Sequence, residues 1–217
     1  MVLKIFFFLA GFIPIYSFAN SQTILPERVD ERYVYHSSPI SGLSKLSPHV
    51  STHNMKWVYA AENPAIALSF LSEAGDFTFG KGSCDGGVFH IVERYPNALE
   101  AYRNTKGSLY RLDRKYFKSG QTNWNEKVVS THVVPVKEEW VIDDALSIIK
   151  KLALKNLIKI YYYPSRPRCI PKNDSDILEK AIRWEQEGRE VRKNFFTLHP
   201  KLKNQFLEKI NNLSVSR

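Results

Sequence analysis

The chain has 217 residues, of which 43% are hydrophobic and 13% aromatic, which is enough apolar surface to build the core of one domain. Lys and Arg number 31 against 22 Asp and Glu, so the formal net charge is +9. In the densest basic patch, 180–209, the positive residues are interleaved with glutamates, which is typical of a solvated helix face. The composition therefore does not favour nucleic-acid binding, which would use a cleaner basic stripe with stacking aromatics. An anionic small molecule or an acidic protein surface fits the charge equally well.

The first residues have the pattern of a secretory signal peptide, which we assign to 1–19. Lys4 precedes an uncharged, mostly apolar run that ends in Ser-Phe-Ala at 17–19. The run is shorter than the roughly 20 apolar residues of a membrane-spanning helix, and Pro14 would weaken such a helix. We therefore expect a secreted or periplasmic protein with no membrane span after signal removal. An uncleaved anchor or a buried core element are the alternatives.

After a loose segment, 20–32, short β-branched and aromatic runs alternate with polar turns and predict strands. These strands are expected at 33–37, 57–61, 88–93, 109–112, 126–130, 132–136 with an extension over 139–142, and 159–163. Helices are expected at 65–74, 143–156, 175–190 and 200–212.

Two local signals add detail to this assignment. Asn63 is a capping residue and Pro64 suits a first helical position, so a helix should begin there and bury Ile66 and Phe70. The glycine-rich stretch 75–87 predicts a long flexible loop.

The expected architecture is α+β, with mostly antiparallel or mixed sheets and few helices. One domain would cover 33–165, followed by a helical C-terminal segment, 174–213. Regular βαβ alternation is missing, and the sequence contains no GxGxxG, P-loop or GxSxG motif, so dinucleotide-binding Rossmann folds, P-loop enzymes and serine hydrolases of that type are not expected.

The chain contains two cysteines, Cys84 and Cys169, both in loop-like sequence. In an exported protein this even count predicts one disulfide. Neither cysteine has a histidine placed in sequence as expected for a nucleophile, and the spacing of cysteines and histidines predicts no metal site.

Three residues are candidates for chemistry. His36 ends the first predicted strand in the motif YHSS, Tyr59 lies in the second strand in the motif VYAA, and Glu126 opens a later strand in the motif NEKVVS. Together with the helix that follows VYAA, these motifs resemble the core of the ADP-ribosyltransferase fold. More narrowly, they resemble its His-Tyr-Glu class, shared by diphtheria-type toxins and poly(ADP-ribose) polymerases, and small bacterial proteins with a YHGS-like motif. The resemblance covers about 33–163.

The resemblance implies a fold of split sheets and NAD as the substrate. His36 would hydrogen-bond a ribose hydroxyl, and Ser37 and Ser38 would line the pocket. Tyr59 would stack on the nicotinamide ring. Glu126 would stabilise the positive charge that develops as nicotinamide leaves. The family usually has glycine where this chain has Ser37.

Simpler interpretations stay open for the same residues. His36 could cap a strand, Tyr59 could belong to the core, and Glu126 could be a solvated strand end. We interpret His53, His90 and His132 as structural, and the pairs Glu93-Arg94 and Glu138-Glu139 as surface. The first functional hypothesis is an exported enzyme that transfers ADP-ribose to a protein target or another macromolecule, or hydrolyses NAD. The alternative is an inactive secreted binding module that uses its basic surface, including Arg183, Arg189, Arg192 and Lys193.

Overall fold

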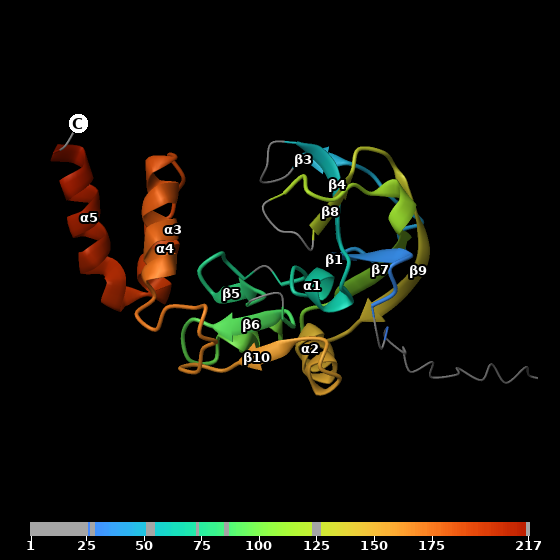
Figure 1. Ribbon diagram of the computed structural model, residues 1–217, viewed down its shortest axis with the longest axis horizontal. Coiled ribbons are helices and arrows are strands. Elements are labelled where there is room, and N and C mark those ends of the chain that lie inside the picture. Colours follow the sequence, from blue (N-terminus) through green and yellow to red (C-terminus); the bar gives the residue numbers. More distant parts are fainter. Residues whose placement is uncertain are drawn as a thin grey trace, which may run out of the picture.

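The computed structural model describes residues 26, 29–50, 55–72, 74–84, 87–122 and 127–215. The predicted signal peptide, 1–19, lies outside the described residues, as do His53 and Glu126. Within the described ranges the protein is a mixed α+β fold, as predicted, with a curled antiparallel sheet and few helices (Figure 1).

The main sheet has seven strands in the order β2-β9-β7-β1-β4-β3, with β8 also paired to β4. All of these pairings are antiparallel. Its strands are β1 Tyr33–Ser38, β2 Lys45–Leu46, β3 His49–Val50, β4 Lys56–Ala61, β7 Gly107–Asp113, β8 Lys127–Ser130 and β9 Val134–Ile142. The predicted strands of this region are confirmed to within a few residues, while β2 and β3 are two-residue strands in sequence expected to form turns.

The two faces of the main sheet contact different cores. Because successive side chains of a strand point to opposite faces, β1 places Val34 in one cluster and Tyr35 in the other. The Val34 cluster includes Val58 and Tyr110. The Tyr35 cluster packs against the helices α1 (Pro64–Leu68) and α2 (Ala145–Leu154).

A second, three-stranded sheet lies beside α1 and α2 (Figure 1). It consists of β5 (Phe79–Gly82), β6 (His90–Glu93) and β10 (Lys159–Tyr161), with β6 in the centre. β10 runs parallel to β6, and β5 runs antiparallel to it. The prediction of a loop over 75–87 is wrong for β5, because the glycine-containing segment gains its order from pairing with β6.

Helix α1 begins as predicted but ends early. The Asn63 side chain accepts a hydrogen bond from the Ala65 backbone N–H at 2.8 Å, and Pro64 takes the first helical position. The helix ends at Leu68 instead of near 74. The predicted burial of Phe70 is therefore wrong: its side chain is 44% exposed, whereas Ile66 is buried.

The C-terminal helices have an apolar cluster of their own. The helices α3 (Ser175–Gln186), α4 (Arg192–Leu198) and α5 (Lys203–Val215) lie beyond the small sheet (Figure 1). Phe195 and Phe206 are fully buried there, and Phe77, from the turn before β5, joins the same cluster. His199 binds the Phe77 carbonyl oxygen through Nε2 at 2.8 Å. The helices are thus joined through Phe77 and His199 to the turn that precedes β5.

Charged side chains also join these helices to the small sheet. Arg94 follows β6 and forms ion pairs with Asp174 and Asp176 at the start of α3, while Arg166 also pairs with Asp174. Glu93 accepts hydrogen bonds from the backbone N–H groups of Leu99 and Tyr163 at 2.8 and 2.9 Å. The surface interpretation of Glu93-Arg94 is therefore wrong, because both residues are buried and bonded.

In the part of the chain that the structure describes, no helix combines the length and the apolar composition that crossing a membrane requires.

We predict that Arg94→Ala destabilises the protein by about 1–3 kcal/mol, because Asp176 loses its partner while Asp174 keeps Arg166. Urea unfolding followed by circular dichroism measures the change. Arg103→Ala is the matched control, since the Arg103–Glu100 pair is exposed on both sides, and its unfolding midpoint should hardly move. Equal midpoints for the two variants would contradict a stabilising role for the buried network.

Candidate functional site

The two central strands of the main sheet diverge beside α1. β1 pairs with β7 along its whole length, from Tyr33–Asp113 to Ser38–Ser108. Against β4, its register contains the pair Tyr35–Ala61 alone among the described residues. β4 instead continues its ladder with β8. The divergence leaves backbone groups of β4 facing the side chains of β1.

A cleft of about 440 Å³ lies at this divergence. Its wall is formed by 35–37 of β1, by 59–61 of β4, and by Ala67 and Phe70 of α1 and the following turn. His49, Asp76 and Lys127 complete the lining. The volume falls within the range of about 300–1,000 Å³ typical of small-molecule sites.

The cleft brings His36 and Tyr59 together. His36 Nδ1 lies 2.7 Å from the backbone carbonyl oxygen of Tyr59. A carbonyl oxygen only accepts hydrogen bonds, so Nδ1 carries the proton and donates. Burial lowers the pKa of His36, while the hydrogen bond to Tyr59 acts in the opposite direction. The ring is therefore neutral at neutral pH, and its Nε2 is a hydrogen-bond acceptor.

Tyr59 contributes an aromatic ring to the same cleft. Its side chain is partly exposed, and its ring meets Trp57 edge-on at a centroid distance of 5.8 Å. Phe70, 44% exposed, lines the cleft from the turn after α1. The cleft therefore combines aromatic surface with a fixed acceptor nitrogen.

The two predicted pocket serines differ in position. Ser37 lines the cleft, and its hydroxyl donates to the Ala67 carbonyl oxygen at 2.6 Å, which ties β1 to α1. Ser38 is not part of the lining. Its buried Oγ accepts a hydrogen bond from the Ile40 backbone N–H at 3.1 Å.

Glu126 lies outside the described residues. The next residue, Lys127, begins β8, pairs with Ala61 and lines the cleft. The predicted glutamate is therefore one position in sequence from the cleft wall.

Two lysines that the sequence did not indicate flank Phe70. Lys127 Nζ lies 4.4 Å from the centre of the Phe70 ring, and Lys81 Nζ lies 4.8 Å from it. Lys81 also donates to the Ser69 carbonyl oxygen at 2.5 Å. Burial, reinforced by repulsion from Lys127, lowers the pKa of Lys81 to about 7, and burial lowers the pKa of Lys127 as well. The residues come from three separate segments, so no local motif could have revealed them.

The pair Glu138-Glu139 does not face the cleft, but Glu139 is more than a surface residue. It accepts hydrogen bonds from the Gly42 backbone N–H at 2.8 Å and from the hydroxyls of Ser108 and Tyr110 at 2.5 and 3.1 Å. Partial burial raises its pKa, but these three bonds together hold it below the ordinary value. Glu138 pairs with Arg111. Glu139 thus fixes the loop after β1, which is a structural role.

Comparisons of the chain with protein-family models, with curated proteins and with solved structures find no match. The functional argument therefore depends on the cleft itself.

We predict that stability decreases as the pH falls below about 6.5, the ordinary pKa of histidine. Burial lowers the pKa of His36, His90 and His199 in the folded protein. As the pH falls, the unfolded chain therefore binds protons before the folded protein does. The stabilising contribution of these three histidines is fully present above about pH 6.5 and is lost as the pH falls toward their pKa values in the folded protein.

Thermal melting between about pH 8 and pH 5 checks this, and His36→Gln should flatten the dependence. His132→Gln, at an exposed position, should leave it unchanged. A melting temperature that stays constant across this interval in the unmodified protein would refute the expectation.

Proposed function

We propose that the cleft binds NAD and that the protein is an exported ADP-ribosyltransferase-like enzyme, which transfers ADP-ribose to a macromolecular target or hydrolyses NAD. The observation that carries the proposal is the meeting of His36 and Tyr59, 23 residues apart in sequence, in one cleft at the divergence of two strands. These are two of the three residues that the resemblance to the His-Tyr-Glu class selects.

His36 is suited to hold a ribose. The Tyr59 carbonyl oxygen fixes the tautomer in which Nδ1 donates and Nε2 accepts. An acceptor nitrogen in a partly buried cleft suits a sugar hydroxyl, which donates one proton. The lowered pKa keeps this acceptor available at neutral pH.

Tyr59 and Phe70 supply flat apolar surfaces for the rings of a dinucleotide. Tyr59 would stack on nicotinamide, and Phe70 stands at the exposed side of the cleft. Lys127 and Lys81 flank the Phe70 ring with two ammonium groups, which complement an anionic pyrophosphate.

The chemical step breaks the bond between nicotinamide and C1 of its ribose. The bonding electron pair leaves with nicotinamide, which becomes neutral, and positive charge develops on the ribose. The Glu126 carboxylate would stabilise that charge. An acceptor side chain or water then forms the new bond to C1 and releases a proton. Because nicotinamide is a good leaving group, positioning supplies much of the catalysis.

One observation favours the alternative, an inactive binding module on the same scaffold. Ser37 stands where the family usually has glycine, and its hydroxyl is held by the Ala67 carbonyl oxygen. A side chain at this position narrows the cleft beside His36. If no dinucleotide binds, the scaffold and its basic surface would serve to recognise an acidic partner.

We expect the chain to release nicotinamide from NAD and Glu126→Gln to reduce the rate by about 10²–10³-fold, the usual cost of removing one electrostatic group. The measurement is chromatographic quantification of nicotinamide. Tyr59→Ala should weaken NAD binding by up to about tenfold through loss of stacking, while Tyr59→Phe should retain it. His132→Ala is the control. No release and no shift in melting temperature with NAD would exclude the enzyme and leave the binding module.

The cationic side of the cleft gives a separate test. Lys127→Met should weaken NAD binding by roughly tenfold to a hundredfold, as expected for loss of one charge-assisted contact, and should reduce its dependence on salt. Lys150→Met removes the same charge from the exposed face of α2, away from the cleft lining. Equal effects of the two substitutions would mean that only net charge matters.

A further inference from the structure

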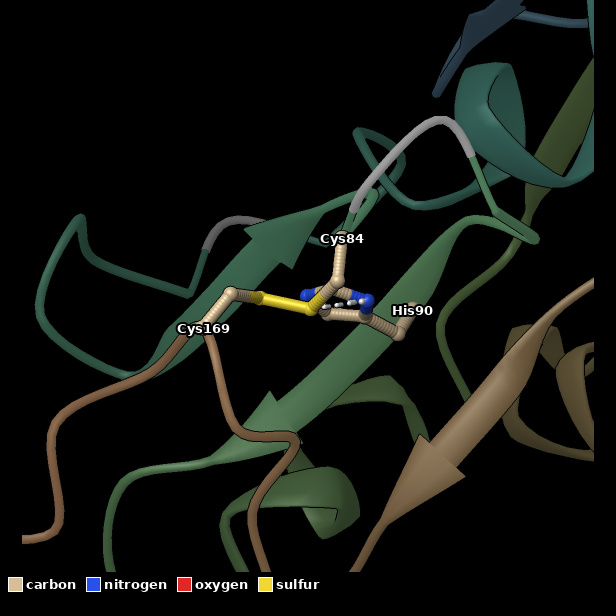
Figure 2. A group of neighbouring side chains, drawn as sticks. All are labelled: Cys84, His90 and Cys169. Carbon is tan, nitrogen blue, oxygen red and sulfur yellow. Dashed lines mark hydrogen bonds between the residues drawn. A yellow bond between two sulfur atoms is a disulfide. The ribbon is translucent and has the colours of Figure 1, made fainter.

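Cys84 and Cys169 form a disulfide, as predicted, and a buried histidine lies against it (Figure 2). Cys84 lies between β5 and β6, and Cys169 follows β10, 85 positions later in sequence. His90 opens β6, and its Nδ1 lies 4.0 Å from Sγ of Cys84. Three separate segments thus converge at one point.

The position of His90 is fixed by the small sheet. The residue pairs with Gly82 of β5 and with Lys159 of β10, so neighbouring strands hold it on both sides. The Tyr161 ring stands edge-on to the imidazole at 5.9 Å, and His90 is only 3% exposed. Burial, with Arg94 and Lys159 nearby, lowers the pKa of His90, so its ring is neutral.

The disulfide gives this buried histidine only a weak hydrogen-bond partner. A buried polar ring costs free energy unless it has a good hydrogen-bond partner, and a disulfide sulfur is a weak one. An apolar side chain would pack against the bridge at lower cost. The presence of an imidazole at this position is explained better if a ring nitrogen of His90 also binds a ligand.

The three ligand atoms match the preferences of zinc. Sγ of Cys84, a ring nitrogen of His90 and Sγ of Cys169 all lie within 4.8 Å of one another. Zinc prefers thiolate sulfur and neutral imidazole nitrogen in tetrahedral geometry. A hollow of about 220 Å³ adjoins Cys84 and His90, with Lys159, Tyr161 and Arg168 in its wall, and offers space for water as a fourth ligand.

We propose that the disulfide is one of two states of this site, and that after reduction Cys84, His90 and Cys169 bind a zinc ion. A thiol reductant delivers two electrons and two protons to the disulfide and is itself oxidised. Zinc then displaces both protons from the two thiols. The resulting centre carries no net charge, because two thiolates balance the divalent cation. The ion continues to tie the loop between β5 and β6 to the segment after β10 when the covalent bond is absent.

The test uses the full chain in its oxidised form and after reduction by a phosphine, which is then removed under inert gas. Zinc is titrated against a chromogenic chelator. Cobalt absorption reports thiolate ligation through its charge-transfer band. We expect one zinc ion per reduced chain and none per oxidised chain. His90→Phe should weaken binding by more than the roughly 10–100-fold that follows loss of an outer-shell partner.

Cys84→Ser should abolish the tight site, and His132→Phe, at an exposed histidine, should not affect it. Circular dichroism of oxidised His90→Phe checks its fold, and His90→Gln, a polar replacement, should also lose affinity if the first variant misfolds. The proposal is overturned if the reduced protein binds no more zinc than Cys84→Ser. It is also overturned if folded His90 variants bind as tightly as the unmodified chain, since the cysteines would then act alone.

Discussion

The cleft exists because β1 and β4 separate after a single shared position, Tyr35–Ala61. A regular ladder would have used the Tyr59 carbonyl oxygen for a backbone hydrogen bond. Here the His36 side chain satisfies that oxygen, at 2.7 Å. This one hydrogen bond links β1 to β4 where their backbone pairing stops. It also sets the tautomer of the imidazole and brings His36 and Tyr59 together. β4 also pairs with β8, and this pairing places Lys127 in the lining of the cleft.

The fold was predictable where local chemistry agreed with tertiary pairing. Tyr33–Ser38 and Lys56–Ala61 are β-branched or aromatic runs, and both are strands. Phe79–Gly82 has two glycines and low intrinsic preference for a strand, yet it pairs with β6 over its whole length. That order comes from a neighbour distant in sequence. Phe70 illustrates the reverse, since the helix that would have buried it stops at Leu68.

The candidate sites also differ in whether local sequence or long-range packing reveals their residues. His36 and Tyr59 could be selected from the sequence because each sits in a recognisable strand motif. Phe70 lines the cleft, and Lys81 reaches the Phe70 ring only through packing between separate segments. The sequence gives His90 no evident partner, which favours a structural interpretation, and the two cysteines, 85 positions apart, lack the short spacing of zinc motifs. The pairing of β6 with β10 helps to bring Cys84, His90 and Cys169 together, a grouping that no linear pattern contains.

The lysines beside Phe70 are the groups that would meet the anionic part of the proposed ligand. Burial and the proximity of Lys127 lower the pKa of Lys81 to about 7, so the surroundings disfavour its ammonium form. Asp76 lies in the cleft wall and attracts both lysines, but burial remains the dominant effect on each. Apolar side chains would pack against Phe70 without that cost. An anion bound between the two lysines would favour their charged forms and offset it. A local arrangement of this kind is consistent with the proposed binding of an anion, because departures from the most stable packing are expected at functional sites.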